Sequence, residues 1–286
     1  MSDPIRRVAT GNRDNVARQD LLMPPHLHGT ARNMADKSSE LLSIVEQLLS
    51  ELYASTDVLR FSFDSEQGLQ ATNLYLRVLD LARSCVVLAR AGHLAALRIV
   101  LRPLLSASAD LVNVSKDPSY PASMFCTCRA QSVHLFKRAI DEAPPDSYLK
   151  QIVEKYDLVQ KKREHESEIA KYKAEGGKNL TDRSRFEQAG MLDAYFTDYW
   201  FLSLETHNDP HVLQAHHVDQ RTEPPRLVYD KPAVHEEMEN CVWSIATTLK
   251  RAHAAVSQAL SSVPNESIER TFSLLDRWEN DTSIET

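Results

Sequence analysis

Glycine is scarce in this chain, and its scarcity constrains the fold more than any other feature of the sequence. Only 7 of the 286 residues are glycine, against an average usage of about 7%. Tight β-turns and phosphate-binding loops need glycine, because it adopts positive φ freely and lets the backbone approach a neighbour closely. The composition therefore favours α-helices joined by short polar turns. It also disfavours nucleotide binding, and no GxGxxG or GxxxxGK[ST] segment is present.

Apolar residues that recur three and four positions apart predict a series of amphipathic helices. The expected helices span residues 35–54, 65–91, 93–116, 119–141, 146–174, 183–207, 233–262 and 266–278. The segment 93–116 is strongly apolar, so we expect it at the centre of the fold, with a kink at Pro103. Gly92 is expected to end the preceding helix, Gly190 to interrupt a later one, and Asn265 to cap the last.

Together these helices predict a single all-α domain of seven or eight helices, covering residues 33–286. Residues 1–32 are polar and have few periodic apolar positions, which predicts a flexible arm. Residues 208–232 contain four prolines, which predicts a long loop. No internal repeat or sustained heptad pattern indicates a solenoid or a coiled coil.

The segment 146–174 becomes heavily charged toward its end, which predicts a solvated helix that extends beyond the core. Asp157 and Lys161 have the spacing of an i,i+4 ion pair, and Glu168 and Lys171 that of an i,i+3 pair. Basic residues cluster here, but the glutamates among them dilute the positive charge. A solvated face is therefore favoured over a nucleic-acid site.

Charge and hydropathy restrict the environment and the partners. The formal net charge of −7 opposes nonspecific attraction to a polyanion. The longest apolar run, residues 85–105, is interrupted by three arginines and a histidine, whereas a membrane span needs about 20 mostly apolar residues. The N-terminal residues lack the apolar core of a secretory signal. We therefore expect a cytoplasmic protein that has no membrane partner.

The four cysteines predict structural thiols. Cys85 and Cys241 lie among apolar residues and are expected to be buried. Cys126 and Cys128 form a CxC pair, which differs from the CxxC pair of zinc sites and thioredoxin-like sites. Neither arrangement predicts a redox centre.

A row of polar side chains on one apolar helix is the main candidate site. Tyr195, Tyr199, Ser203 and His207 follow one another at four-residue steps, and each step advances only about 40° around an α-helix. Buried hydroxyl groups and imidazoles need hydrogen-bond partners, because an unpaired one costs about 1–3 kcal/mol. Arginine on the apolar segment 93–116 could satisfy them with its five donors.

Two arginines on that segment, Arg98 and Arg102, are the candidates. A guanidinium group could hold the tyrosines and the serine in place. It could equally bind a phosphate or a carboxylate through two parallel hydrogen bonds.

These residues carry a resemblance to a known group of proteins. The segment "AGHLAALRIVLRPLLSASADLVNVSKDP" and the later "YFTDYWFLSLETH" resemble an uncharacterised family of helical, mostly bacterial proteins with a domain of unknown function. That family has R-x-x-x-E on an apolar helix ending near "KDP", and then Y-x-x-x-Y-x-x-L-S-x-x-x-H. Arg102 matches the arginine and the row from Tyr195 to His207 matches the second motif, whereas Ser106 replaces the glutamate. The match covers roughly residues 69–211.

The family also looks distantly like the HEPN ribonucleases of toxin and antiviral systems. Their signature places an arginine four to six residues before a histidine, and no arginine stands in that position before His207. The resemblance implies a metal-independent ribonuclease. His207 would be the acid or base, Arg102 would stabilise the phosphorane, and Ser203 or Tyr199 would position the substrate. Tyr195 and Arg98 would contribute to binding.

A second interpretation is a binding or regulatory component of a bacterial defence or stress module. The polar row would then hold the helices in register, while the arm, the charged helix or the long loop contacts a partner. A protein partner, RNA and a second copy of the chain all stay open as ligands. The first structural question is whether His207 lies in an open cleft near Arg102.

A metal site is the third interpretation. His207 and His211 have HxxxH spacing, and Asp209, His216 and His217 lie close by. Pro210 disfavours a continuous helix through the pair, and no HExxH glutamate is present. We therefore predict no metal site and no cofactor.

Overall fold

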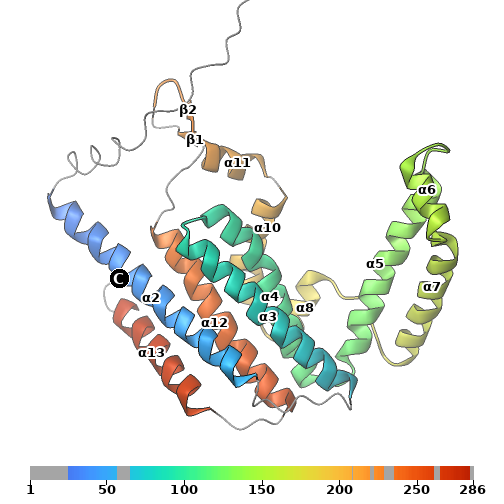
Figure 1. Ribbon diagram of the computed structural model, residues 1–286, viewed down its shortest axis with the longest axis horizontal. Coiled ribbons are helices and arrows are strands. Elements are labelled where there is room, and N and C mark those ends of the chain that lie inside the picture. Colours follow the sequence, from blue (N-terminus) through green and yellow to red (C-terminus); the bar gives the residue numbers. More distant parts are fainter. Residues whose placement is uncertain are drawn as a thin grey trace, which may run out of the picture.

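The computed structural model describes residues 25–56, 65–207, 209–219, 222–228, 235–260 and 265–283. In these residues the fold is all-α, as predicted, with one small two-stranded sheet. Five long helices build the bundle: α2 (Pro25–Ser55), α3 (Glu66–Arg90), α4 (Leu94–Lys116), α12 (His235–Leu260) and α13 (Glu266–Ser283). Helix α12 packs against α2, α3 and α4, and α13 lies on the outer side of α2 (Figure 1).

Helix α4 lies at the centre of the fold, as its apolar sequence predicts. It packs against α3 and α12 on one side and against the later helices α8 and α10 on the other. From residue 107 to residue 115 every side chain is buried, which is the pattern of a helix surrounded on all sides. The helix continues without interruption through Pro103.

The ends of the helices follow local capping rules. Gly92 has φ of +73°, and His93 N–H donates to the Leu88 carbonyl at 2.9 Å, which closes the C-terminus of α3 as a Schellman motif. Asn265 caps α13, because its side-chain oxygen accepts from Ser267 N–H at 2.9 Å. The roles predicted for Gly92 and Asn265 are therefore confirmed.

A helical arm projects from the bundle (Figure 1). It consists of α5 (Tyr120–Glu142), α6 (Tyr148–Lys155) and α7 (Leu158–Ala174), and α7 packs back along α5. The prediction of one continuous helix over 146–174 is wrong. Asp157 takes a left-handed conformation with φ of +43°, and its carboxylate caps α7 by accepting from Gln160 N–H.

The ion pairs expected in this arm also differ. Because the Asp157 carboxylate serves as a cap, it makes no ion pair with Lys161 in the described residues. The i,i+4 pair of α7 joins Lys162 to Glu166 at 2.7 Å instead. Glu168 approaches Arg129 on α5 and so helps to join the two long helices of the arm.

The predicted helix over 183–207 is divided into shorter pieces. They are α8 (Asp182–Ala189), α9 (Leu192–Ala194), the π-helix η1 (Tyr195–Tyr199) and α10 (Trp200–Thr206). The predicted interruption at Gly190 is confirmed, since this residue has φ of +73°. These divisions give the described residues more helices than the seven or eight expected.

Two segments expected to be irregular contain regular structure. Helix α2 begins at Pro25, so the last residues of the expected 1–32 arm are helical, whereas residues 1–24 lie outside the described residues. Part of the expected loop 208–232 forms α11 (Pro210–His217) and the antiparallel pair β1 (Val218–Asp219) and β2 (Arg226–Leu227). Asp209 caps α11 and Pro210 occupies its first turn, where proline is compatible with a helix.

The buried carboxylate of Asp110 on α4 fastens α8 and α5 to the central helix. Arg185 of α8 donates from Nε to Asp110 Oδ1 at 2.8 Å, and a second guanidinium nitrogen contacts Oδ2. Tyr120 of α5 donates to the same carboxylate at 2.8 Å. Asn113 Nδ2 donates a hydrogen bond to the Arg185 carbonyl oxygen at 2.8 Å. Burial opposes the charge of Arg185, but the hydrogen bonds and the charge of Asp110 outweigh it and raise the pKa of the guanidinium.

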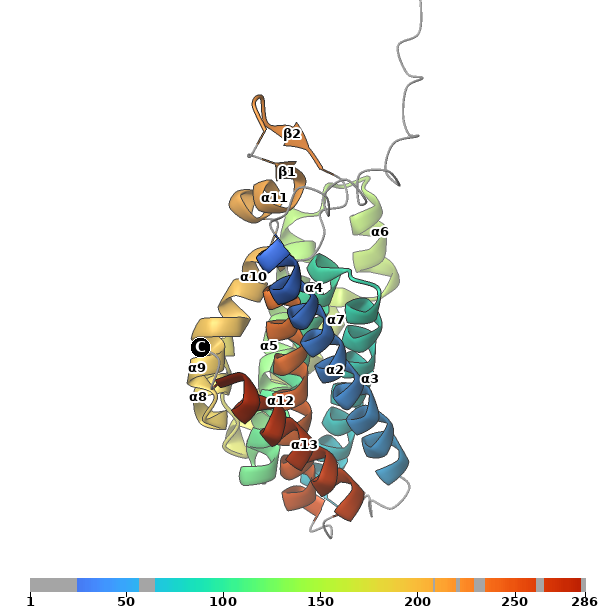
Figure 2. The same cartoon turned by 90° about the vertical axis from the view of Figure 1, so that its left-hand side faces the viewer.

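The helices η1 and α10 run along the outside of the bundle (Figure 2), held to α4 next to this ion pair. In the described residues, no helix combines the length and the apolar composition that are needed to cross a membrane.

We expect Asp110→Asn to lower the free energy of unfolding by about 1–3 kcal/mol, because Arg185 loses its buried carboxylate and keeps, among the described residues, only that of Asp182, 3.1 Å from Nη1. Chemical denaturation monitored by circular dichroism measures the change. Asp193→Asn, at an exposed position on α9, is the matched control and should stay within about 0.5 kcal/mol of the parent. Equal effects of the two substitutions would contradict the anchoring role of Asp110.

Gly177 is expected to tolerate no side chain. A Cβ atom there would lie 2.7 Å from the Tyr172 carbonyl oxygen and 2.8 Å from the Ala122 carbonyl oxygen of α5. Gly177→Ala should therefore push the segment off α5 and destabilise the protein by about 1–3 kcal/mol. Lys178→Ala, at the exposed neighbouring position, is the control. Thermal denaturation of the two variants tests the contact, and unchanged stability in Gly177→Ala would refute it.

Candidate functional site

The predicted polar row meets Arg102, which is 101 positions before Ser203 in the sequence. Arg102 Nε donates to Ser203 Oγ at 3.1 Å, and Nη2 donates to the Tyr199 hydroxyl at 2.9 Å. The guanidinium carbon also lies 4.8 Å from the centre of the Tyr199 ring. A third partner is Asp182 of α8, whose Oδ2 lies 3.8 Å from Nη2. We call Arg102, Asp182, Tyr199 and Ser203 the arginine cluster.

Proton positions in the arginine cluster follow from its hydrogen bonds. The Tyr199 hydroxyl donates to Asp182 Oδ2 at 2.7 Å and accepts from Arg102. Burial and the hydrogen bond to Asp182 raise the Tyr199 pKa, so the phenol stays protonated at neutral pH. Ser203 donates to the Tyr199 carbonyl at 2.9 Å. The hydroxyl groups are thus committed to internal partners, and the cluster acts chemically as a clamp between α4, α8 and α10.

The π-helix adjusts the register of this row. Trp200 N–H bonds to the Tyr195 carbonyl, an i→i+5 step that widens the turn. Four residues of an α-helix rotate by slightly more than one full turn, whereas four residues of the wider π-helix rotate by slightly less. The π-helix therefore offsets the sideways displacement of the row around the helix axis. Tyr195 and Tyr199 therefore stack, with ring centroids 5.6 Å apart and planes 21° apart.

Tyr195 takes a packing role. Its ring lies 5.6 Å from Phe186 of α8, and Phe186 also contacts Tyr199 at 4.8 Å. In the described residues Tyr195 makes no hydrogen bond to Arg102 or Arg98. Within the predicted polar row, Tyr195 therefore makes apolar contacts, whereas Tyr199 and Ser203 make polar contacts.

His207 stands apart from the arginine cluster. It is exposed at the C-terminus of α10, where its backbone N–H donates to the Ser203 carbonyl at 3.1 Å. Within the part of the chain that the structure describes, no hydrogen bond joins its imidazole to Arg102. His211 is also exposed, in the first turn of α11. Among the described residues, no three histidine, cysteine or carboxylate side chains are grouped so as to hold a metal ion.

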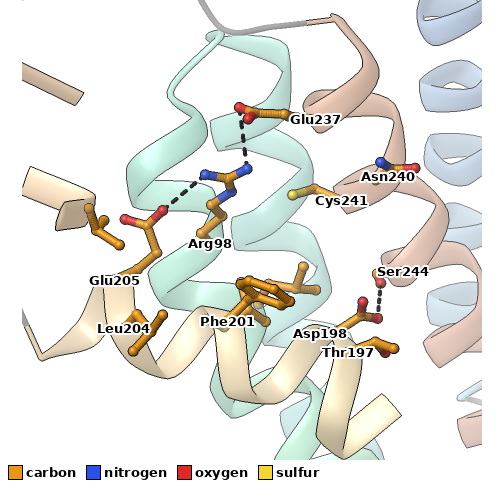
Figure 3. A pocket seen from close by; sticks show the side chains of 13 residues that line it. Arg98, Thr197, Asp198, Phe201, Leu204, Glu205, Glu237, Asn240, Cys241 and Ser244 are labelled. Atoms are coloured by element: carbon orange, nitrogen blue, oxygen red, sulfur yellow. Dashed lines mark hydrogen bonds and ion pairs between the residues drawn. The ribbon is translucent and has the colours of Figure 1, made fainter. Parts of the chain in front are cut away.

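Arg98 forms a second, separate centre one turn before Arg102 on α4. Its Nη1 donates to Glu205 of α10 at 2.9 Å, and Nη2 lies 3.3 Å from Glu237 of α12. Burial opposes the charge of Arg98, but Glu237 and Glu205 outweigh it and raise its pKa. Arg98 therefore holds the ends of three helices together (Figure 3).

A cavity of about 430 Å³ lies between these helices. Figure 3 shows Arg98 between its two glutamates, with Phe201 below it and Cys241 beside it. Asp198 of η1 also lines the cavity and accepts a hydrogen bond from Ser244 of α12 at 2.7 Å. Burial raises the pKa of the Cys241 thiol to about 11, so this sulfur is protonated and a poor nucleophile at neutral pH.

Three large aromatic side chains are exposed on η1 and α10, and one of them, Phe201, lines the cavity. Phe196, Trp200 and Phe201 are 53%, 48% and 61% exposed, and the rings of Trp200 and Phe201 lie 5.1 Å apart, edge to face. We call these three residues the aromatic face. Folded proteins seldom leave large apolar side chains clustered on the surface unless they contact a partner.

Sequence reasoning missed the acidic members of both centres. Asp182, Glu205 and Glu237 complete the contacts of Arg102 and Arg98, but each is an ordinary charged residue in its local pattern. Asp110 had a detectable signal, since it is a single carboxylate within a continuous apolar run. Its partner, Arg185, is 75 positions away and has no such signal.

Comparisons with known proteins support one of the expectations from the sequence. No curated protein and no solved structure matches the chain. A family model described as a family of unknown function, DUF5677, matches residues 70–224, which is more than half of the chain. This range includes the arginine cluster, the aromatic face and the whole projecting arm, and it confirms the predicted relationship to an uncharacterised family. The chain therefore belongs to the family of unknown function DUF5677.

Proposed function

We propose that this protein is a binding or regulatory component that engages a protein partner through its aromatic face. The observation that carries this proposal is the exposure of Phe196, Trp200 and Phe201 on one short helical segment. Aromatic side chains are enriched among the residues that dominate protein–protein affinity, because they bury a large area with few rotatable bonds. The cytoplasmic location and the bacterial defence or stress setting stay predictions.

The arginine cluster supports this role by keeping the aromatic face rigid. Arg102 ties η1 and α10 to α4 through Tyr199 and Ser203, and Arg185 ties α8 to the same helix through Asp110. A rigid surface binds more tightly than a mobile one, because less conformational entropy is lost on association. The polar row is thus a structural support for a binding surface.

Photo-crosslinking from the aromatic face tests the proposal. We expect the photoreactive residue p-benzoylphenylalanine at position 201, in the full chain expressed in the source cells, to give one defined adduct with another protein. Trp200→Ala in the same chain should lower the adduct yield about tenfold or more, because it removes the neighbouring aromatic contact. Mass spectrometry identifies the adduct and quantifies its yield.

Position 148 provides the matched control, since Tyr148 is 77% exposed but lies on α6 in the arm. The same photoreactive residue there should not give the adduct. The proposal fails if both positions give the same products, or if position 201 crosslinks only to a second copy of this chain.

The second candidate is the metal-independent ribonuclease. One observation favours it: the His207 side chain is exposed at the end of the helix that carries Ser203, so it is accessible for proton transfer. Against it, Arg102 is engaged by Tyr199, Ser203 and Asp182 and shares no hydrogen bond with His207 in the described residues. An RNA phosphate would have to draw both groups into one site.

Cleavage of single-stranded RNA in excess EDTA distinguishes the two candidates. The binding proposal predicts equal and negligible cleavage by the parent protein and His207→Ala, because no assembled acid–base pair is present. The ribonuclease instead requires cleavage by the parent that falls about 10²–10⁴-fold in His207→Ala. His211→Ala, at a nearby exposed histidine, is the control and should match the parent in either case. Gel analysis of labelled RNA measures the rates.

A further inference from the structure

The cavity between α4, η1–α10 and α12 carries more negative than positive charge. Among the described residues, its lining contains the carboxylates of Asp198, Glu205 and Glu237 and one guanidinium group, that of Arg98. Arg251 of α12 lies outside the lining but close enough for Asp198 to raise its pKa against the stronger lowering effect of burial. Even when both arginines are counted, three carboxylates face two cations in the part of the chain that the structure describes. An anionic ligand is therefore disfavoured.

Asp198 is the carboxylate that can accept further hydrogen bonds. Arg98 engages Glu205 and Glu237, at 2.9 and 3.3 Å. Asp198 accepts a hydrogen bond from the Ser244 hydroxyl at 2.7 Å. A carboxylate has about four acceptor positions, so the one hydroxyl donor found among the described residues leaves room for the N–H groups of a ligand.

The arrangement of the walls fits an organic cation better than a metal ion. The three carboxylates come from three different helices and stand on separate sides of the cavity (Figure 3). No metal-binding group of three side chains exists in the described residues. The exposed ring of Phe201 rims the opening, and aromatic faces attract ammonium and guanidinium groups. A volume of about 430 Å³ is also within the range of small-ligand pockets.

We propose that this cavity receives a lysine or arginine side chain of a protein partner, whose neighbouring apolar side chains cover Phe201 and Trp200. The inference rests on the proposed function, because it names the chemistry by which the partner is recognised. A protein side chain is favoured over a free amine because the aromatic face continues outside the opening, where a small cation would leave it uncovered. The partner segment then needs both a basic side chain for the cavity and apolar side chains for the surface beside it.

A pair of small probes tests the cavity by itself. N-acetyl-argininamide and its neutral counterpart N-acetyl-citrullinamide are titrated into the full chain, and NMR follows the amide signals of Thr197, Asp198 and Ser244. We expect saturable shifts with the arginine probe at about fivefold lower concentration than with the citrulline probe. Asp198→Asn should abolish the preference while it retains an oxygen that can accept from Ser244. Equal responses to the two probes in the parent would overturn the inference.

Crosslinking separates this inference from the proposed function. Asp198→Asn should lower the adduct yield from position 201 by about fivefold. If Trp200→Ala removes the adduct but Asp198→Asn leaves it unchanged, the partner is real and the cationic side chain is refuted. If the arginine probe is preferred but position 201 gives no protein adduct, the assignment to a protein side chain is overturned and the cavity belongs to a free organic cation.

Discussion

The ion pair between Arg185 and the buried Asp110 is the interaction on which the outer part of the fold depends. It places a charge on the most enclosed helix and neutralises it from α8, which the short helix α9 connects to η1 and α10. Tyr120 adds a third helix, α5, to the same carboxylate. Because a buried carboxylate without a partner is costly, this contact favours the observed positions of α8 and α5 on α4. Both the arginine cluster and the aromatic face inherit their positions from this contact.

The arginine cluster shows how a pattern typical of catalysis can serve packing. Histidine, tyrosine, serine and arginine are the residues from which acid–base sites are built. Here the Tyr199 phenol donates its hydrogen bond to Asp182, and the Ser203 hydroxyl donates to a backbone carbonyl. His207 is exposed at the end of the helix. The side chains that can contact a ligand or partner lie elsewhere. They are the Asp198 carboxylate and the exposed rings of Trp200 and Phe201. The adjoining surface is therefore a better candidate for a binding site than the arginine cluster.

Errors in the sequence-based prediction have identifiable physical causes. Asp157 was expected to pair with Lys161, but an aspartate can also cap a helix, and only the left-handed turn at that residue decides between the two. Pro210 suggests an irregular loop when it is read as a helix breaker, yet in the first turn it begins α11. The π-helix at Tyr195–Tyr199 has no marker in the spacing, because the same four-residue steps suit both kinds of helix over one turn.

The sequence by itself determined the all-α fold, the central place of α4, the stops at Gly92 and Gly190 and the contact partners Tyr199 and Ser203 for an arginine on that helix. These features depend on local periodicity, on capping and on the need of buried polar groups for partners, which are all legible over a few turns. Only the tertiary structure decided that Arg102 binds Asp182 while Arg98 binds Glu205 and Glu237, and that His207 lies outside both sets. Those choices depend on distances between helices about a hundred residues apart in sequence, which no local pattern encodes.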